Sequence, residues 1–164
     1  MAEENSGQGA GPAPRVLSDG ALSELLSAQQ FGILATNKRS GHPHLTTMLY
    51  AWDPATRTVR FSTTADRVKV RQLHNDPRAA LHVSSEDHWS FAVAEGEAEV
   101  SDVTGKPGDA TGRELFAMLP LNARPSAPEE RDAFFGQLVA EQRVVIRLAV
   151  NRLYGTALDV PGAD

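Results

Sequence analysis

The chain has 164 residues, of which 41% are apolar and 23% charged, an ordinary globular composition that argues against a disordered chain. No apolar run reaches the roughly 18 residues needed to cross a bilayer, so no transmembrane segment is predicted. The lack of cysteine excludes disulfides, thiolate metal sites, Fe–S clusters and a cysteine nucleophile. The beginning of the sequence lacks the basic and apolar regions of a secretory signal, and together these features favour a cytoplasmic protein.

The beginning of the chain differs in composition from the rest. Residues 1–16 are rich in Gly, Ala, Pro and Ser and offer almost nothing to a core, which predicts a disordered tail. Residues 17–160 carry regular apolar patterns and are expected to fold as one domain. The domain is expected to begin with a helix that Ser18 caps, and the inward residues of this helix are Leu22, Leu25 and Leu26.

Six strands are predicted where alternating or β-branched segments lie between turn residues. Their ranges are 31–36, 45–52, 58–62, 79–84, 89–100 and 143–150. Alternation places Val59 with Phe61 on one face, and Val144 with Ile146 and Leu148 on another. Further helical patterns follow the third strand and cover residues 112–119 and 128–140. Short turns between most strands predict a mainly β fold, a six-stranded antiparallel barrel with peripheral α-helices. Gly96 is the expected bulge of the long strand.

The charge is unevenly distributed. The net charge of the chain is −5, which disfavours non-specific nucleic-acid binding because that binding depends on neutralising phosphates. Residues 60–78 nevertheless hold five basic and two acidic residues, a net charge of +3, and leave −8 for the remainder. A compact basic segment in an acidic protein indicates a small anionic ligand better than a polymer. The alternative interpretation is a solvated helix face with arginines by chance.

This basic segment has the residue types of a phosphate site. A predicted strand ends in hydroxyl side chains, and a helix with basic side chains follows; any of Thr63, Thr64 and Asp66 could cap that helix. Free N–H groups at a helix N-terminus, with hydroxyl donors beside them, form an anion site. The alternative is an N-capped surface helix. The candidate phosphate ligands are Ser62, Thr63, Thr64, Arg67 and Lys69.

Other motifs argue against several enzyme classes. The sequence has no G-x-G-x-x-G fingerprint, no complete phosphate loop and no G-x-S-x-G nucleophile elbow. His42 and His44 share a strand face, but Pro43 separates them and no further metal ligand follows at a suitable spacing. We therefore predict no metal site.

Four segments resemble a known family. They are FGILATNKRSGHPHLTTMLYAWD (31–53), VRFSTTADRVKVRQLHNDPRAALHV (59–83), HWSFAVAEGEAEV (88–100) and RVVIRLAVNRLYG (143–155). Their order resembles the pyridoxamine-phosphate-oxidase-like FMN-binding split barrels, and more closely the actinobacterial branch that binds the deazaflavin coenzyme F-420. The R-x-K-x-R-x-L-x-x-D-P-R element and the W-S-x-A-V-A-E-G strand are the most specific parts of this resemblance.

The resemblance implies a homodimer of split barrels with cofactor sites at the subunit interface. In such proteins the residues that match Arg67 and Lys69 hold the phosphate, and the preceding hydroxyl residues help. The segment that matches Thr46, Thr47 and Met48 lies along the ring system, and the match of Trp89 comes from the partner subunit. Gln72 stands where the family often has Asn, so a contact from its amide is a further expectation.

The implied function is that of an F-420-dependent oxidoreductase, which transfers a hydride between the reduced deazaflavin and a small conjugated organic substrate. Such a cofactor carries the hydride chemistry itself, so we predict no particular catalytic residue. One alternative is an FMN-dependent oxidase or reductase on the same fold, because the phosphate argument is identical. A second is a non-catalytic protein that binds a flavin, a deazaflavin or haem.

Overall fold

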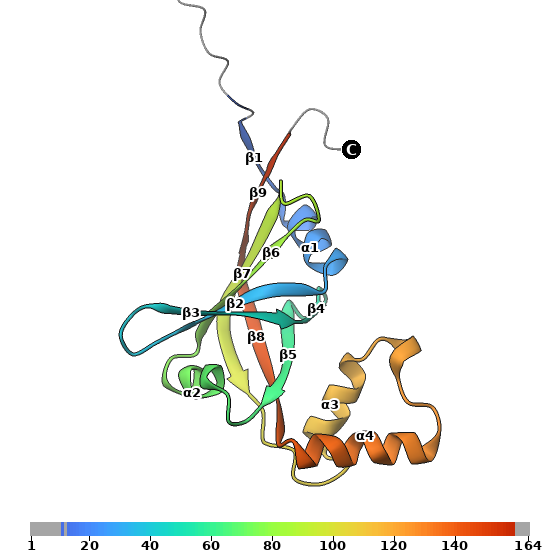
Figure 1. Cartoon of the computed structure of the whole chain (residues 1–164). Helices are drawn as coiled ribbons and strands as arrows, with labels where there is room; N and C mark the ends of the chain where they lie inside the picture. Colours follow the sequence, from blue (N-terminus) through green and yellow to red (C-terminus); the bar gives the residue numbers. More distant parts are fainter. Residues whose placement is uncertain (1–10, 12, 160–164) are drawn as a thin grey trace, which may run out of the picture.

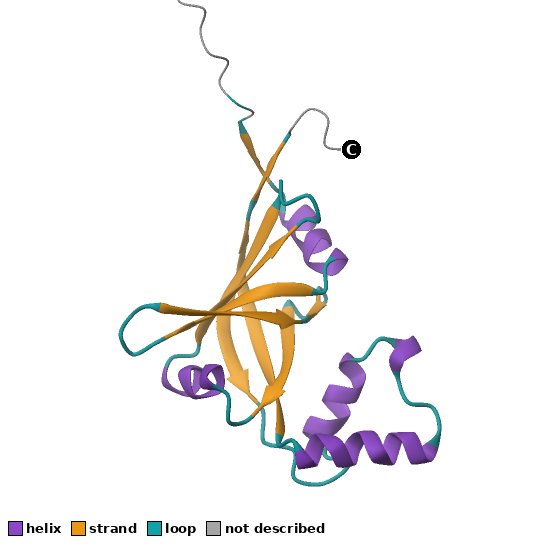
Figure 2. Ribbon diagram, in the orientation of Figure 1, coloured by secondary structure: helices purple, strands orange, loops and turns teal. Residues whose placement is uncertain are grey.

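The computed structural model describes residues 11 and 13–159. Nine strands in this part form one curled sheet and one short ribbon, and helices cover the ends (Figures 1 and 2). The elements are β1 Pro14–Val16, α1 Asp19–Ala28, β2 Phe31–Asn37, β3 Pro43–Leu49, β4 Ala51–Asp53, β5 Thr58–Thr64, α2 Val68–Asn75, β6 Arg78–Ser84, β7 Phe91–Val100, α3 Ala110–Met118, a 3-10 turn Leu121–Ala123, α4 Pro128–Ala140, β8 Arg143–Tyr154 and β9 Thr156–Leu158.

The main sheet has seven strands in the order β3-β2-β6-β7-β8-β5-β4, and every neighbouring pair is antiparallel. β3 and β4 are therefore the two edges of the sheet, although only Tyr50 separates them in the chain. The chain passes from one edge to the other at this residue, and the curl of the sheet in Figure 1 brings these edges together. This arrangement confirms the predicted mainly β split barrel.

The core of the barrel lies on the faces that sequence alternation predicted. Val59 and Phe61 are fully buried, and so are Ile146 and Leu148 on β8. Helix α1 closes one end of the barrel. As predicted, the Ser18 hydroxyl caps this helix by accepting a hydrogen bond from the Ala21 N–H at 3.2 Å. The helix residues Leu22 and Leu26 join the same core, with Leu25 packed against it.

Several predicted boundaries were wrong. The strand predicted at 45–52 is two strands, and the total is nine strands rather than six, because β1 pairs with β9 and the edge strand breaks at Tyr50. Part of the predicted disordered tail is ordered, since Pro14–Val16 form β1; residues 1–10 and 12 of that tail lie outside the described residues. Helix α2 begins later than predicted, and its N-cap is Arg67, without a side-chain cap.

A helical hairpin, α3 and α4, is inserted between β7 and β8 and packs beside the barrel (Figure 2). Glu114 of α3 joins it to the sheet: its carboxylate accepts hydrogen bonds from Arg60 Nε at 3.0 Å and Arg147 Nε at 2.9 Å. The Arg147 and Arg60 guanidinium groups hold the pKa of Glu114 below its ordinary value. A second small core, formed by Leu115, Leu138 and Val145, lies between the hairpin and the outer side of β8. Of the helices in residues 13–159, none is both long and apolar enough to span a bilayer.

The bulge predicted at Gly96 is present, as a register shift between Glu95 and Gly96 opposite β8. A Cβ at this position would overlap the Ala149 carbonyl oxygen of the neighbouring strand. We therefore expect Gly96→Ala to lower the melting temperature, because forcing extra volume into a packed site costs about 1–3 kcal/mol, or roughly 2–12 °C for a domain of this size. Gly20→Ala on α1, where a Cβ meets nothing within 4 Å, is the matched control and should not lower it. Equal melting temperatures by circular dichroism would contradict the steric explanation.

Candidate functional site

Lys69 is the most unusual charged residue of the predicted phosphate site. Its side chain lies in the first turn of α2, and the residue is only 8% exposed. Its amine makes no hydrogen bond or ion pair with another residue of 13–159, and it is not fully enclosed, so a ligand can reach it from solvent. Burial lowers the pKa of Lys69, and the nearby charge of Arg67 lowers it further. An anion placed beside this amine would supply the missing partner.

The N-terminus of α2 adds to this positive potential. Arg67 is exposed and takes the N-cap position without a capping side chain, so the first N–H groups of the helix are not satisfied by a capping side chain. Arg71 lies one turn further along and donates to the Asp66 carbonyl oxygen at 2.7 Å. Asp66 is the acidic residue that directly precedes Arg67 and helix α2. The hydrogen bond from Thr64 and the charge of Arg67 hold the pKa of Asp66 below its ordinary value.

The three predicted hydroxyl ligands do not form one cluster, because β5 alternates its side chains between two faces. Thr63 is buried with Val59 and Phe61 on the core side of the strand. Ser62 and Thr64 point to the opposite side, where the Thr64 hydroxyl donates to Asp66 and the Ser62 hydroxyl accepts a bond from Arg143 at 3.4 Å. Ser62 and Thr64 therefore remain accessible from one side of the sheet, and Thr63 does not.

The predicted ring-binding segment lies on edge strand β3. Thr46 and Met48 are half-buried on its inner face, whereas Thr47 is exposed on the outer face. The Thr46 hydroxyl is the one buried side-chain polar atom of residues 13–159 that lacks a hydrogen-bond partner. Native structures rarely leave such a group unsatisfied unless a ligand or water completes it. Thr46 therefore marks a polar contact that is still to be made.

Gln72 of α2 uses its amide oxygen within the protein. This oxygen accepts a hydrogen bond from the Thr36 hydroxyl at 2.7 Å and lies 3.0 Å from His44 Nδ1. Both partners belong to the β2–β3 hairpin, so Gln72 fixes α2 against the strand that carries Thr46. The amide nitrogen of Gln72 is the part left for the predicted cofactor contact.

Trp89 lies far from α2 within one chain. Its carbonyl oxygen accepts a hydrogen bond from Leu158 of β9 at 2.8 Å, so it belongs to the end of the barrel where β1 and β9 pair. Helix α2 lies at the other end (Figure 1). The Trp89 side chain is 43% exposed. The structure thus brings together Arg67, Lys69 and Gln72 on α2, but not Trp89.

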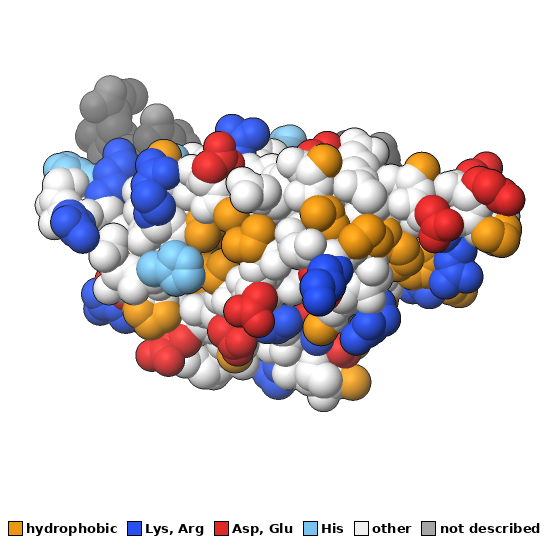
Figure 3. All heavy atoms as spheres, turned by 90° about the horizontal axis from the view of Figure 1, so that it is seen from below, with side chains coloured by type: hydrophobic (Ala, Val, Ile, Leu, Met, Phe, Trp, Pro, Cys, Tyr) orange, Lys and Arg blue, Asp and Glu red, His pale blue; other side chains and the backbone are white. Residues whose placement is uncertain are grey.

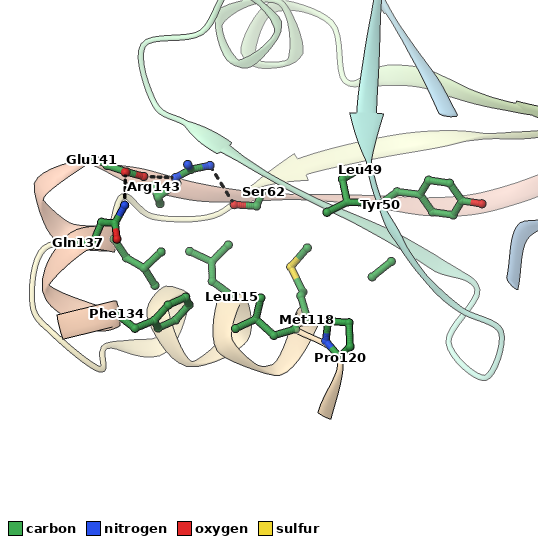
Figure 4. Close-up of a pocket in the computed structure, with 13 residues that line it drawn as sticks. Leu49, Tyr50, Ser62, Leu115, Met118, Pro120, Phe134, Gln137, Glu141 and Arg143 are labelled. Atoms are coloured by element: carbon green, nitrogen blue, oxygen red, sulfur yellow. Dashed lines mark hydrogen bonds and ion pairs between the residues drawn. The ribbon is translucent and has the colours of Figure 1, made fainter. Parts of the chain in front are cut away.

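A cavity of about 430 Å³ lies between the barrel and the helical hairpin, and sequence reasoning missed it (Figure 4). Leu49 and Ser62 line it from the strands, and Arg143 from the start of β8. Its floor comes from the α3–α4 insertion, which the sequence showed only as two helical patterns. The sequence placed Arg143 as the first residue of the last predicted strand, which was the one available sign of its role. In the structure Arg143 pairs directly with Thr64 of β5. The view from below the barrel, Figure 3, shows hydrophobic side chains across the middle of this end of the molecule, with charged side chains around them.

Comparison with known proteins agrees with this architecture. The family model described as pyridoxamine 5'-phosphate oxidase matches residues 18–157. The conserved hypothetical protein Rv2991 from Mycobacterium tuberculosis is 22% identical, with a TM-score of 0.68 over 94% of this chain and 99% of that one. A FAD-binding protein from Mesorhizobium loti is 19% identical, with a TM-score of 0.61 over 92% of this chain and 100% of that one.

A third solved structure, an F-420 reductase, is 25% identical, with a TM-score of 0.56 over 80% of this chain and 94% of that one. The matched region of the family model contains the whole seven-stranded sheet, helix α2 and the β3 edge with its unsatisfied threonine. The chain therefore belongs to the pyridoxamine 5'-phosphate oxidase family of flavin-binding split barrels.

Proposed function

We propose that this protein is an F-420-dependent oxidoreductase that transfers a hydride between the reduced deazaflavin and a small conjugated organic molecule. The observation that carries the proposal is the largely buried side chain of Lys69, whose unpaired amine is close to the charge of Arg67. Partial desolvation of a charge without a partner is unfavourable, so such a group close to a second cation indicates an anion-binding site. A phosphorylated cofactor supplies the negative charge that this site lacks.

The residues present fit such a group. Lys69 and Arg67 provide one point charge and one planar guanidinium, and the α2 N-terminus adds oriented N–H groups. Thr46 and Met48, which the sequence resemblance matches to the ring-binding segment, lie on β3, where the buried Thr46 hydroxyl has no hydrogen-bond partner. The bond of Gln72 to Thr36 holds α2 and the β2–β3 hairpin in a fixed relation, which sets the distance between the phosphate and ring contacts.

When bound, the reduced deazaflavin supplies a hydride to an electrophilic carbon of the substrate, and a proton from water completes the reduced product. The protein's part is binding, orientation and charge neutralisation. Lys69 and Arg67 neutralise the phosphate, and β3 supports the ring. No side chain need act as an acid or base for this transfer.

The outer surface of the sheet supports a homodimer. Phe31 and Leu49 are paired across β2 and β3 and are 61% and 57% exposed, and Ile33 and Leu45 beside them are 40% and 58% exposed. An exposed apolar patch on two adjacent strands is characteristic of an interaction surface. The sequence resemblance implies that the second copy supplies its own Trp89 to the first chain's site, and within one chain Trp89 lies at the opposite end of the barrel from α2.

The choice of F-420 over FMN rests on the sequence resemblance and on the likeness to an F-420 reductase. We expect the purified protein to bind F-420 more tightly than FMN when each is titrated and followed by its own fluorescence. Tighter binding of FMN would replace the proposal by the FMN-dependent alternative. Binding of either cofactor without turnover of any acceptor would indicate a carrier protein.

Replacing Lys69 by Met separates ligand binding from stability. Methionine keeps the apolar length of the side chain and removes the partly desolvated charge, so the melting temperature should stay the same or rise. Cofactor affinity should fall about 10-fold or more, since a hydrogen bond to a charged group contributes about 1.5–3 kcal/mol. Lys106→Met, at an exposed lysine in the loop before α3, is the control and should change neither. A large loss of stability with unchanged cofactor affinity would assign Lys69 a structural role.

The dimer is tested by light scattering at micromolar concentration, where we expect twice the mass of the chain. Ile33→Glu places a charge in the apolar patch and should produce monomers with weakened cofactor binding, because the partner's contribution is lost. Val103→Glu changes an equally exposed apolar residue in the loop after β7 and should leave the dimer intact. A monomeric unmodified protein would contradict the shared site.

A further inference from the structure

One row of side chains crosses the outer face of the sheet and has a histidine at its centre. In the register of the sheet, the neighbouring strands β3, β2, β6, β7 and β8 contribute in turn Thr47, Ile33, His82, Val93 and Tyr154. Directly opposite residues on neighbouring strands have Cβ atoms about 4.5–5.5 Å apart on the same face. His82 therefore lies in the middle of five strands, away from every edge of the sheet.

The neighbours of His82 on this face are apolar. Its ring stacks on Phe91 of β7, with the ring centroids 5.4 Å apart and an angle of 19° between the planes. On its other side it pairs with the exposed Ile33 of β2. His82 and Phe91 thus extend onto β6 and β7 the exposed apolar patch formed by Phe31, Ile33, Leu45 and Leu49.

A second copy of the chain fits this face better than an unlike partner. The patch carries both signs of charge at its edge toward β8, where Glu95 and Arg152 lie 3.6 Å apart. A two-fold axis places the same surface against itself, so each sign on one copy can meet the opposite sign on the other. Ala35 and Ala80, which pair in the next row, line a hollow of about 500 Å³ that allows a close approach.

The ionisable groups on β7 and β8 offer His82 no free carboxylate. Glu95, diagonal to His82 across the β6–β7 pair, already forms the ion pair with Arg152. The Arg152 guanidinium also lies over the ring of Tyr154, 4.9 Å from its centroid. Burial and the charge of Glu95 raise the pKa of Tyr154, so this phenol stays neutral up to pH 8.

The other elements around the ring add no acid to the patch. The one ionisable residue of β2 and β3 is His44, which lies on the inner face. At the start of β6, Arg78 is bound to Asp76 at 2.7 Å. The turn from β6 to β7 lies beyond the strand ends and has three exposed ionisable residues, Glu86, Asp87 and His88. A proton on His82 therefore adds an uncompensated charge to an apolar surface.

We propose that His82 makes the dimer pH-sensitive: protonation of its imidazole separates the two subunits and opens the shared cofactor site. This inference rests on the proposed function, whose partner is the second copy, and adds a regulation to that site. Histidine is the side chain that ordinarily changes charge between pH 5 and 8. A charge is unfavourable in an apolar contact, and an interface between two copies contains His82 twice.

The direction of the pH effect follows from proton linkage. If the separated chains bind protons at His82 and the dimer does not, falling pH favours the separated chains. The dimer is then stable at pH 8 and weakened as the pH falls through the histidine range. General electrostatics act in the opposite direction, because the chain carries a net charge of −5 at pH 7 and acid reduces the repulsion between copies.

Sedimentation equilibrium at pH 8 and pH 6, without cofactor, measures the dissociation constant of the dimer. An exposed imidazole is about three-quarters protonated at pH 6, so two copies predict a dissociation constant about tenfold larger at pH 6 than at pH 8. A dissociation constant that is unchanged or smaller at pH 6 would overturn the proposal, and so would a chain that is monomeric at pH 8.

Variants assign the effect to one residue. His82→Gln is polar but cannot titrate, so its dimer should have the same strength at both pH values, whereas His82→Lys should weaken the dimer at both. His42→Gln, in the exposed turn between β2 and β3, is the matched control and should keep the tenfold change. Circular dichroism checks the folding of each variant, and the unmodified protein decides the question if the His82 variants do not fold. A folded His82→Gln dimer that still weakens tenfold at pH 6 would contradict the role of His82.

Cofactor titrations at pH 8, where the dimer is intact, keep the two proposals apart. Binding of F-420 or FMN by a dimer whose strength does not depend on pH would overturn this inference and leave the proposed function standing. A pH-sensitive dimer that binds neither cofactor would refute the proposed function and support the switch at the subunit contact.

Discussion

The corner at Tyr50 is the constraint on which the architecture depends. It joins the two edge strands of the sheet, β3 and β4, with a single residue between them. The Tyr50 hydroxyl donates to the Leu26 carbonyl at 2.6 Å and its N–H donates to the Gln30 carbonyl at 3.0 Å, so the corner is also tied to the end of α1. Burial raises the pKa of this phenol well above its ordinary value, which keeps it a donor. Because the corner brings the edges together, Leu49 and Ser62 line the same cavity.

Some polar groups in and around the candidate site have hydrogen-bond partners within the fold, and others have none. Glu114 is satisfied by two arginines, and the oxygen of Gln72 by Thr36, which makes both structural. Lys69 and the Thr46 hydroxyl have no such partner among the described residues. Locally unfavourable groups that persist in a well-packed protein are usually retained for function. Here the two lie on α2 and β3, the elements that Gln72 connects.

Sequence patterns predicted most of the barrel and the basic part of the site. Alternation correctly placed Val59 and Phe61 inside, because a half-buried strand has a period of two. The same rule separates Thr63 from Ser62 and Thr64, a consequence that follows only once the strand is known to continue to Thr64. The Tyr50 corner was not predictable, since residues 45–52 contain no glycine, proline or other turn residue that would signal a change of sheet edge. The cavity depends on contacts between distant segments, and no local pattern encodes these.

The two walls of the cavity belong to different hydrophobic cores. On the barrel side Tyr50 packs into the barrel core, whereas Leu115 and Leu138 on the hairpin side pack with Val145 in a separate cluster on the outer side of β8. Substitutions at distant, independently packed positions have nearly additive effects on stability. Divergent relatives could therefore remodel the hairpin side chains, and with them the shape of the chamber, at little risk to the barrel. Such a division lets one wall of the cavity change in evolution while the barrel itself is inherited unchanged.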